Sequence, residues 1–150
     1  MALDVLILRD PREAAKKCSL TPLRGMPGIE IVGYDSSRRL SAGKRLFLSP
    51  EGELISERDR GLSLLLIDCA WRKVPSLLKT IDGELIPRRL PPLVTAYPRK
   101  SMVFEDPLEG LASVEALYAA LALLGEVHPE LLAQYHWREQ FLAANPALPR

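Results

Sequence analysis

Residues 64–67 form an apolar run that ends in an acid, Asp68, and Trp71 follows three positions later. A run of this length between polar segments is typical of a strand covered on both faces, which usually means a parallel sheet with helices on either side. Ligands of such sheets bind beyond the carboxyl ends of the strands, so Asp68 and Trp71 are placed where a ligand is expected. The structural alternative is that Asp68 caps the next helix while Trp71 packs in the core.

Strand and helix signals elsewhere indicate an α/β amino-terminal part. Strands are expected at residues 4–9, 29–32 and 45–48, with a turn at 49–52 after the third. The Ser-x-x-Asp spacing at residues 56–59 predicts a helix of about two turns that leads into the strand at 64–67. Strands that alternate with short helices are typical of an α/β fold.

The carboxyl-terminal part is expected to be helical. Four prolines exclude a long helix or a central strand near residues 86–94, so a shaped loop is predicted there. Residues 110–125 predict a helix, with Ser113 as its cap and Gly125 at its end, and its apolar composition predicts burial between other elements. A last helical region runs from Pro129 to Asn145. These patterns divide the chain into an α/β lobe at 1–88 and a helical lobe at 89–150.

The length of 150 residues is enough for one domain, or two small lobes, with a core of its own. Cys18 and Cys69 are far apart and lack paired spacing, which indicates a reducing, cytoplasmic setting. The amino terminus lacks the pattern of a signal peptide, and no apolar run approaches the length that crosses a bilayer. A soluble protein without membrane contact is expected.

The net charge of +1 hides an uneven distribution of charged residues. Residues 1–100 hold 18 Lys and Arg against 12 Asp and Glu, whereas residues 101–150 hold 2 against 7. Adjacent basic pairs suit a phosphate backbone, which provides most of the sequence-independent affinity for nucleic acid. A solvated surface is the alternative. The candidate RNA-binding residues are Lys16, Lys17, Arg72, Arg88, Arg89, Arg99 and Lys100.

Screens for common catalytic motifs leave a short list of candidates. His128 and His136 have no Cys or carboxylate partner at a metal-ligand spacing, so no metal site is expected. The chain contains no GxxxxGK[ST], GxGxxG or GxSxG motif. The remaining set of Asp68, Trp71 and backbone-rich loops suits a small cofactor with an aromatic ring, held by main-chain bonds and apolar walls.

An ordered series of motifs in residues 46–145, with a further signature before it, resembles the small-subunit ribosomal RNA aminocarboxypropyltransferases of eukaryotes and archaea. Each motif is weak alone, and the resemblance depends on their order and spacing. The motifs are Asp10-Pro11, Lys16-Lys17-Cys18-Ser19, Leu48-Ser49-Pro50, Ser56-Glu57-Arg58-Asp59-Arg60, Ile67-Asp68-Cys69-Ala70-Trp71, Arg89-Leu90-Pro91, Ser113-Val114-Glu115-Ala116, Trp137, Phe141-Leu142 and Asn145.

The resemblance implies a SPOUT-like α/β fold with a mainly parallel sheet and a trefoil knot near the cofactor, followed by an all-helical carboxyl-terminal lobe that shares the cofactor pocket. The implied cofactor is S-adenosylmethionine. Its 3-amino-3-carboxypropyl arm, and not its methyl group, is transferred, which leaves 5′-methylthioadenosine. The implied acceptor is N3 of a modified uridine in an rRNA hairpin loop, and a monomer is favoured.

The resemblance also implies how the cofactor is held. The adenine would lie between Leu48, Pro50 and Trp71, while the backbone near Leu90 reads its edge. The Ile67 carbonyl would hold the ribose. Selectivity among the three carbons on the sulfonium must come from geometry, and Trp71 is implied to wall in the methyl group.

Four further residues complete the implied site. Val74 lies one turn from Trp71 on the same face, Ser19 would bind the carboxylate of the transferred arm, and Val114 belongs to the same cofactor set. Asp68 is the candidate catalytic residue, as the general base for N3 or as a group that orients the acceptor base by hydrogen bonding.

One loop departs from the family pattern. The family has asparagines and a glycine where this chain has residues 95–102, and a charged insert follows at 104–109. We therefore expect cofactor binding to be preserved more than the choice of acceptor, which includes another rRNA position or a tRNA. Two other functions stay open: a SPOUT-type RNA methyltransferase that uses the same pocket, and a non-catalytic RNA-binding factor in ribosome assembly.

Overall fold

Five parallel strands form one sheet in the computed structural model, which describes residues 3–12, 19–97 and 111–150. The strand order is β2-β1-β4-β3-β5. This result confirms the predicted α/β class with a parallel sheet. The strands are β1 (Val5–Arg9), β2 (Ile29–Gly33), β3 (Leu40–Leu54), β4 (Ser63–Asp68) and β5 (Ile81–Arg89).

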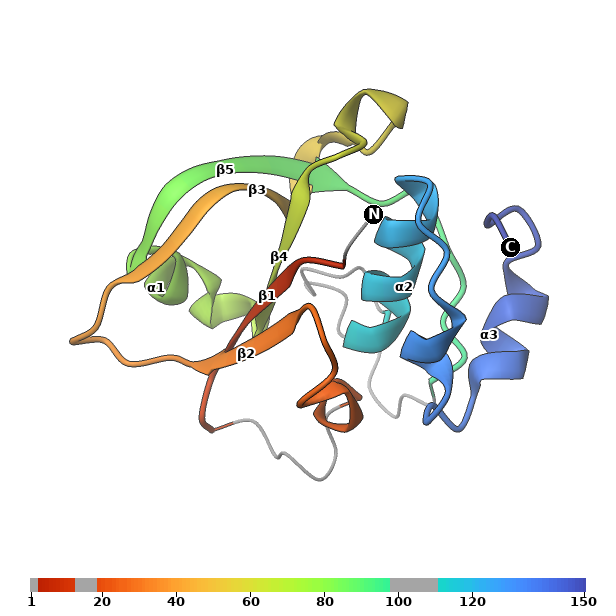
Figure 1. Ribbon diagram of the computed structural model, residues 1–150, viewed down its shortest axis with the longest axis horizontal. Coiled ribbons are helices and arrows are strands. Elements are labelled where there is room, and N and C mark those ends of the chain that lie inside the picture. The colour runs from red at the N-terminus through yellow and green to blue at the C-terminus, as the bar shows by residue number, and fades with distance from the viewer. Residues whose placement is uncertain (1–2, 13–18, 98–110) are drawn as a thin grey trace.

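Both faces of the central strands are covered, as the apolar run at residues 64–67 predicts. Successive side chains of a strand point to opposite faces of the sheet. On β4, Leu64 and Leu66 therefore pack with α2 (Ser113–Leu123), whereas Leu65 and Ile67 pack with α1 (Val74–Leu78). Figure 1 shows α2 and α3 (Arg138–Ala144) on one side of the strands and α1 on the other.

Strand β3 is longer than the sequence pattern predicts. The expected turn at residues 49–52 does not end the strand but forms a bulge within it, so Leu48 and Glu53 both lie opposite Arg88 of β5. The bulge passes so close to β5 that a Cβ atom on Gly52 would lie 2.4 Å from the backbone carbon of Pro87. Pairing with β5, which the local sequence does not reveal, is what continues the strand.

The prediction of a loop through residues 86–94 is wrong in its first part. Strand β5 runs from Ile81 to Arg89 and includes Pro87. Proline cannot donate a hydrogen bond to the ladder, so it is confined to positions where the N–H is not needed, and an edge strand provides them. Since β5 lies at the edge of the sheet, Pro87 is accommodated there.

Two helix predictions also need correction. The segment after Ser56 makes only the short 3-10 helix η2 (Glu57–Asp59) and not a helix of two turns, although Asp59 accepts a hydrogen bond from the Ser56 N–H as the capping pattern requires. In α2 the cap is Ala112 and not Ser113, because Glu115 reaches back to the Ala112 N–H. The predicted burial of α2 is confirmed, since every residue from Val114 to Ala122 is buried.

The remaining elements are short 3-10 helices: η1 (Thr21–Leu23), η3 (Trp71–Lys73) and η4 (Pro129–Leu132). Elements η4 and α3 follow α2 and pack with it in one core cluster, to which Leu131, Leu132 and Phe141 contribute. Among the described residues, no helix combines the length and apolar character that a membrane span requires.

Candidate active site

Asp68 ends β4 beside Arg9, the last residue of β1. The two residues are partners in the strand register, and Arg9 Nε lies 3.1 Å from Asp68 Oδ2. The Ser113 hydroxyl, at the start of α2, lies 3.4 Å from Asp68 Oδ1. A buried carboxylate is costly unless it is paired, so these contacts explain how Asp68 is tolerated at 8% exposure. Asp68 thus contacts the start of α2 as well as β1.

Arg9 is a site residue that sequence reasoning missed. The sequence places Arg9 at the end of the strand predicted at residues 4–9, but does not place it beside Asp68. The pairing of β1 with β4 brings it to Asp68 across 59 positions of sequence. Only the order of strands in the sheet, and not the local pattern, identifies this neighbour.

A second ion pair, between the buried Asp10 and the half-buried Lys73, lies directly beside the first. Lys73 Nζ is 3.0 Å from Asp10 Oδ2, and the Asp10 N–H donates to the Asp68 carbonyl at 3.0 Å. Burial raises the pKa of Asp10, but hydrogen bonds from the Arg12 N–H and from Lys73, together with the charges of both residues, outweigh it and lower this pKa below the ordinary value. The pair links the ends of β1 and η3.

This lowered pKa predicts a dependence of stability on acid. A carboxyl group whose pKa is lower in the folded state contributes stability above its unfolded pKa of about 4, and this contribution is lost as the pH falls through the folded pKa. Between pH 5 and pH 2, the free energy of unfolding of Asp10→Asn is therefore expected to fall by less than that of the unsubstituted protein. Urea denaturation of both proteins at each pH measures this difference. Equal losses over this range would contradict the assignment.

A cavity of about 190 Å³ lies between the bulge of β3 and the carboxyl end of β5. It brings together Leu48, Pro50 and Leu90, three residues of the predicted cofactor set. Typical small-molecule pockets measure about 300–1,000 Å³, so this cavity suits one ring system of a ligand and not a whole cofactor. The full lining is Leu48, Ser49, Pro50, Arg88, Arg89, Leu90, Pro91, Pro92, Leu93 and Leu111.

The cavity and Asp68 meet at the start of α2. Leu111 lines the cavity and Ser113 contacts Asp68, and two residues of chain span at most about 7 Å. The short backbone segment 111–113 therefore connects the cavity, with its predicted adenine-binding residues, to the predicted catalytic acid Asp68.

The backbone of Ile67 faces the gap between β4 and β3. The Leu64 N–H and the Asp68 carbonyl both bond toward β1, and alternate residues of a strand direct their backbone groups to opposite sides, so the Ile67 groups point toward β3. The pairing of β3 with β4 ends at Phe47 and Leu65. The Ile67 carbonyl thus lies beyond the last paired residues of this ladder.

The other predicted cofactor residues are not all in one place. The Ser19 hydroxyl accepts a hydrogen bond from the Val114 N–H at 3.0 Å, so these two residues lie together at the start of α2. Val74 begins α1 and packs in the core cluster on the opposite face, which also contains Ile67. Trp71 begins η3, and its side chain lies outside the part that the structure describes.

The basic candidates divide into three groups. Arg72 and Arg89 are exposed, and Arg89 lines the cavity. Arg88 is turned inward, where its Nε lies 2.9 Å from Oδ1 of the buried Asp59. Consecutive side chains of a strand point to opposite faces, which separates Arg88 from Arg89. The candidates outside the described residues are Lys16, Lys17, Arg99 and Lys100.

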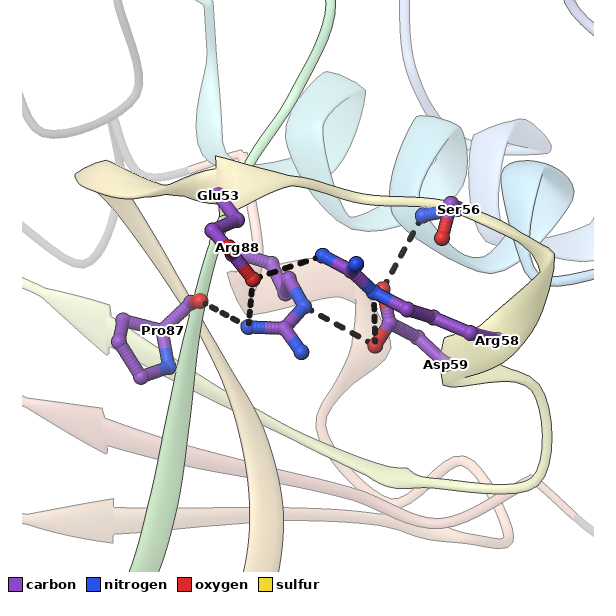
Figure 2. Close-up of polar contacts among 6 residues, drawn as sticks. All are labelled: Glu53, Ser56, Arg58, Asp59, Pro87 and Arg88. Carbon is purple, nitrogen blue, oxygen red and sulfur yellow. Dashed lines mark hydrogen bonds and ion pairs between the residues drawn. The ribbon is translucent and has the colours of Figure 1, made fainter.

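Arg88 belongs to an ion-pair network that holds the bulge of β3 against β5. Figure 2 shows Arg88 and Arg58 converging on Glu53 and Asp59. Glu53 Oε2 lies 2.9 Å from Arg58 and 3.8 Å from Arg88, while the Ser56 N–H donates to Asp59 at 3.0 Å. Glu53 follows the bulge, and the bulge carries Leu48, Ser49 and Pro50 of the cavity wall. The network therefore supports one wall of the cavity.

Within the described ranges, no three His, Cys, Asp or Glu side chains lie together in a way that would hold a metal ion. The charged groups of the site are instead paired with one another. The arrangement thus offers a cavity with leucine and proline walls, a buried acid at the end of β4, and an exposed arginine at the cavity.

Comparisons with known proteins identify the family of this chain. The family described as "Ribosome biogenesis protein, C-terminal" matches residues 43–148. The 16S rRNA aminocarboxypropyltransferase of Vulcanisaeta distributa is 32% identical over 94% of this chain and 77% of that protein. The enzyme of the same name from Thermoplasma acidophilum is 30% identical over 77% of this chain and 74% of that protein.

A solved structure extends the similarity to three dimensions. The SAM-dependent rRNA:acp-transferase Tsr3 from Vulcanisaeta distributa superposes with a TM-score of 0.75 at 28% identity, over 98% of this chain and 80% of that one. The chain belongs to the family of 16S rRNA aminocarboxypropyltransferases.

Proposed function

We propose that this protein transfers the 3-amino-3-carboxypropyl group of S-adenosylmethionine to a uridine, in modified form, of ribosomal RNA during ribosome biogenesis. The observation that carries the proposal is the cavity that joins Leu48, Pro50 and Leu90, next to the buried acid Asp68, in a chain of this family. The finer fold we propose is SPOUT-like, with a trefoil knot and with an α/β lobe at 1–88 and a helical lobe at 89–150 that share the pocket.

The residues present fit the cofactor. A cavity of about 190 Å³ that combines proline and leucine walls with polar groups suits a flat heterocyclic ring, and the main chain near Leu90 would supply polar groups at its edge. Ile67 would hold the ribose through its carbonyl, and the Ser19 hydroxyl, which accepts a hydrogen bond from the Val114 N–H, would donate to the carboxylate of the arm at the start of α2. When bound, S-adenosylmethionine supplies a carbon activated by the sulfonium, and Trp71 and Val74 would enclose its methyl group.

Asp68 is the residue we assign to the acceptor. The N3 atom of uridine carries a proton that must leave before N3 can attack a carbon. Asp68 would accept that proton or the N3–H hydrogen bond, because Arg9 and Ser113 hold its carboxylate in one orientation from two sides. Arg9 is thus a positioning residue for Asp68 and not a cofactor ligand.

The product of the reaction tests the function directly. The purified protein is incubated with S-adenosylmethionine and with small ribosomal subunits from cells that lack the gene, and the small-molecule product is identified by mass spectrometry. The proposal expects 5′-methylthioadenosine together with RNA that carries the added aminocarboxypropyl mass. S-adenosylhomocysteine would instead identify a methyltransferase, and RNA binding without either product would identify a non-catalytic assembly factor.

Arg89 and Arg72 are proposed to contact the phosphates of the RNA, whereas the ion pair of Arg88 with Asp59 assigns Arg88 a structural part. Arg89→Ala is expected to weaken RNA binding and to reduce the salt dependence of the binding constant by about one phosphate contact. The free energy of unfolding should change by no more than about 0.5 kcal/mol from that of the unsubstituted protein, because Arg89 is exposed. RNA affinity measured at several salt concentrations checks this.

Arg88→Ala is the matched comparison for this prediction. It removes a charge at the adjacent position but breaks the ion pair with the buried Asp59. It should therefore lower the urea midpoint, with a smaller effect on the salt dependence of RNA binding. A loss of RNA affinity that is the same for both variants, with the same salt dependence, would contradict the separation of roles.

A further inference from the structure

Glu115 is completely buried, with 0% of its surface exposed, in the otherwise apolar middle of α2. Its carboxylate accepts four hydrogen bonds. Oε1 accepts from the Thr95 hydroxyl at 2.6 Å and from the Ala112 N–H at 2.8 Å, and Oε2 accepts from the Ala96 N–H at 2.9 Å and from the Tyr135 hydroxyl at 3.0 Å. The carboxylate thus joins three separate parts of the chain.

Two of these parts adjoin the walls of the cavity. Ala112 directly follows Leu111, and Ala96 lies three residues after Leu93, and both leucines line the cavity. Glu115 itself does not line it. Its two oxygens therefore connect, through hydrogen bonds, the backbone that adjoins the Leu111 wall to the backbone that adjoins the Leu93 wall.

Asn145 reinforces this attachment one step nearer the cavity. Its side-chain amide accepts from the Val94 N–H and donates to the Val94 carbonyl, both at 2.8 Å. The amide also donates to the Phe141 carbonyl at 2.8 Å, which anchors it to α3. The chain that leaves β5 is thus held by buried side chains at Val94, Thr95 and Ala96.

The chemistry requires a carboxylate at position 115. Each oxygen accepts from one hydroxyl, which can rotate to act as an acceptor, and from one backbone N–H, which cannot. A glutamine at this position has one carbonyl oxygen and one NH₂ group. Whichever way it is turned, the NH₂ group faces either the Ala112 N–H or the Ala96 N–H, and that amide loses its acceptor.

We infer that Glu115 is a positioning residue for cofactor binding, which sets the distance between the cavity walls at residues 90–93 and at Leu111. This inference rests on the proposed function for the identity of the ligand. It assigns Glu115 to binding and not to the chemical step, because its contacts lie behind the walls, while the shorter of the two contacts of Asp68 comes from Arg9 of β1, which Glu115 does not touch.

The test compares Glu115→Gln with Ile81→Ala. Ile81 is a core residue at the amino end of β5, the end opposite the cavity, so its loss lowers stability without a change at the walls. The Kd for S-adenosylmethionine, by calorimetry, and kcat at saturating cofactor are measured for both variants and for the unsubstituted protein. We expect Glu115→Gln to raise the Kd by about tenfold with kcat within a few-fold, and Ile81→Ala to leave the Kd unchanged.

Amide hydrogen exchange without cofactor provides a second readout that does not depend on the ligand. Glu115→Gln should accelerate exchange at Ala96 or at Ala112 more than the global loss of stability explains, and Ile81→Ala should not. If Glu115→Gln proves too unstable to study, Tyr135→Phe removes one donor and retains the ring, and it should raise the Kd by a smaller factor.

The possible failures are distinguishable. Unchanged exchange at both amides, or a kcat loss with an unchanged Kd, would overturn the role of Glu115. A protein without substitutions that does not bind S-adenosylmethionine would overturn the proposed function, while the exchange measurement would still decide whether Glu115 holds the two walls.

Discussion

Asp59→Ala is expected to lower the free energy of unfolding by about 3 kcal/mol, one of the two largest effects expected for a substitution in this chain. Asp59 is 2% exposed and lies 2.9 Å from the Arg88 guanidinium, whose side chain is 15% exposed. Removal of one partner of a buried pair typically costs about 3–5 kcal/mol, because the other charge stays buried without compensation. The lower end applies here, since Glu53 remains within 3.8 Å of Arg88.

Glu53→Ala is the matched control within the same network. Its carboxylate contacts both Arg58 and Arg88, but its side chain is 73% exposed, so its loss should cost no more than about 1 kcal/mol. Urea denaturation of the two variants measures the difference. Equal effects would mean that burial of Asp59 does not determine the strength of the network.

Asp68→Asn is expected to reduce the transfer rate by about 10²-fold or more while cofactor affinity is preserved. General acid–base groups typically contribute about 10²–10⁴-fold, and an asparagine can accept a hydrogen bond from Arg9 but cannot take a proton from N3. Single-turnover rates on ribosomal RNA and the Kd for S-adenosylmethionine, measured separately, check both parts.

Trp71→Ala is expected to weaken cofactor binding, because an aromatic wall is lost.

Asp10→Asn is the control for the loss of a buried carboxylate in the same cluster. Asp10 is 4% exposed and paired with Lys73, and it has no assigned role in transfer. Its transfer rate should therefore stay within a few-fold of the unsubstituted protein. If both substitutions reduced the rate equally, the cluster as a whole, and not Asp68, would be responsible.

The central strands could be predicted because their signals are local. An apolar run that ends in an acid marks β4 without knowledge of its neighbours, whereas residues 48–50 of the cavity wall were identified only through the resemblance to a family. Strand β5 and the second half of β3 could not be predicted in this way. Prolines and a turn-like sequence dominate both segments, and only their pairing with each other makes them strands.

Local sequence patterns could not predict which residues contact the site residues, because these contacts join distant parts of the chain. Arg9 meets Asp68 only through the strand order, and Glu115 meets Ala96 only through the packing of α2. Arg88 and Arg89 are adjacent residues of the same type, yet Arg88 is turned inward to an ion pair and Arg89 is exposed. Their difference depends on which face of β5 meets η2, which is a tertiary property.

The uneven attachment of β3 has a consequence for the motions of the protein. This strand pairs with β5 along nearly its whole length, but it meets β4 only from Arg45 to Phe47. The two strands therefore behave as a ribbon joined to the rest of the sheet by a short seam. We therefore expect local opening at that seam, followed by amide hydrogen exchange, to cost less free energy than global unfolding.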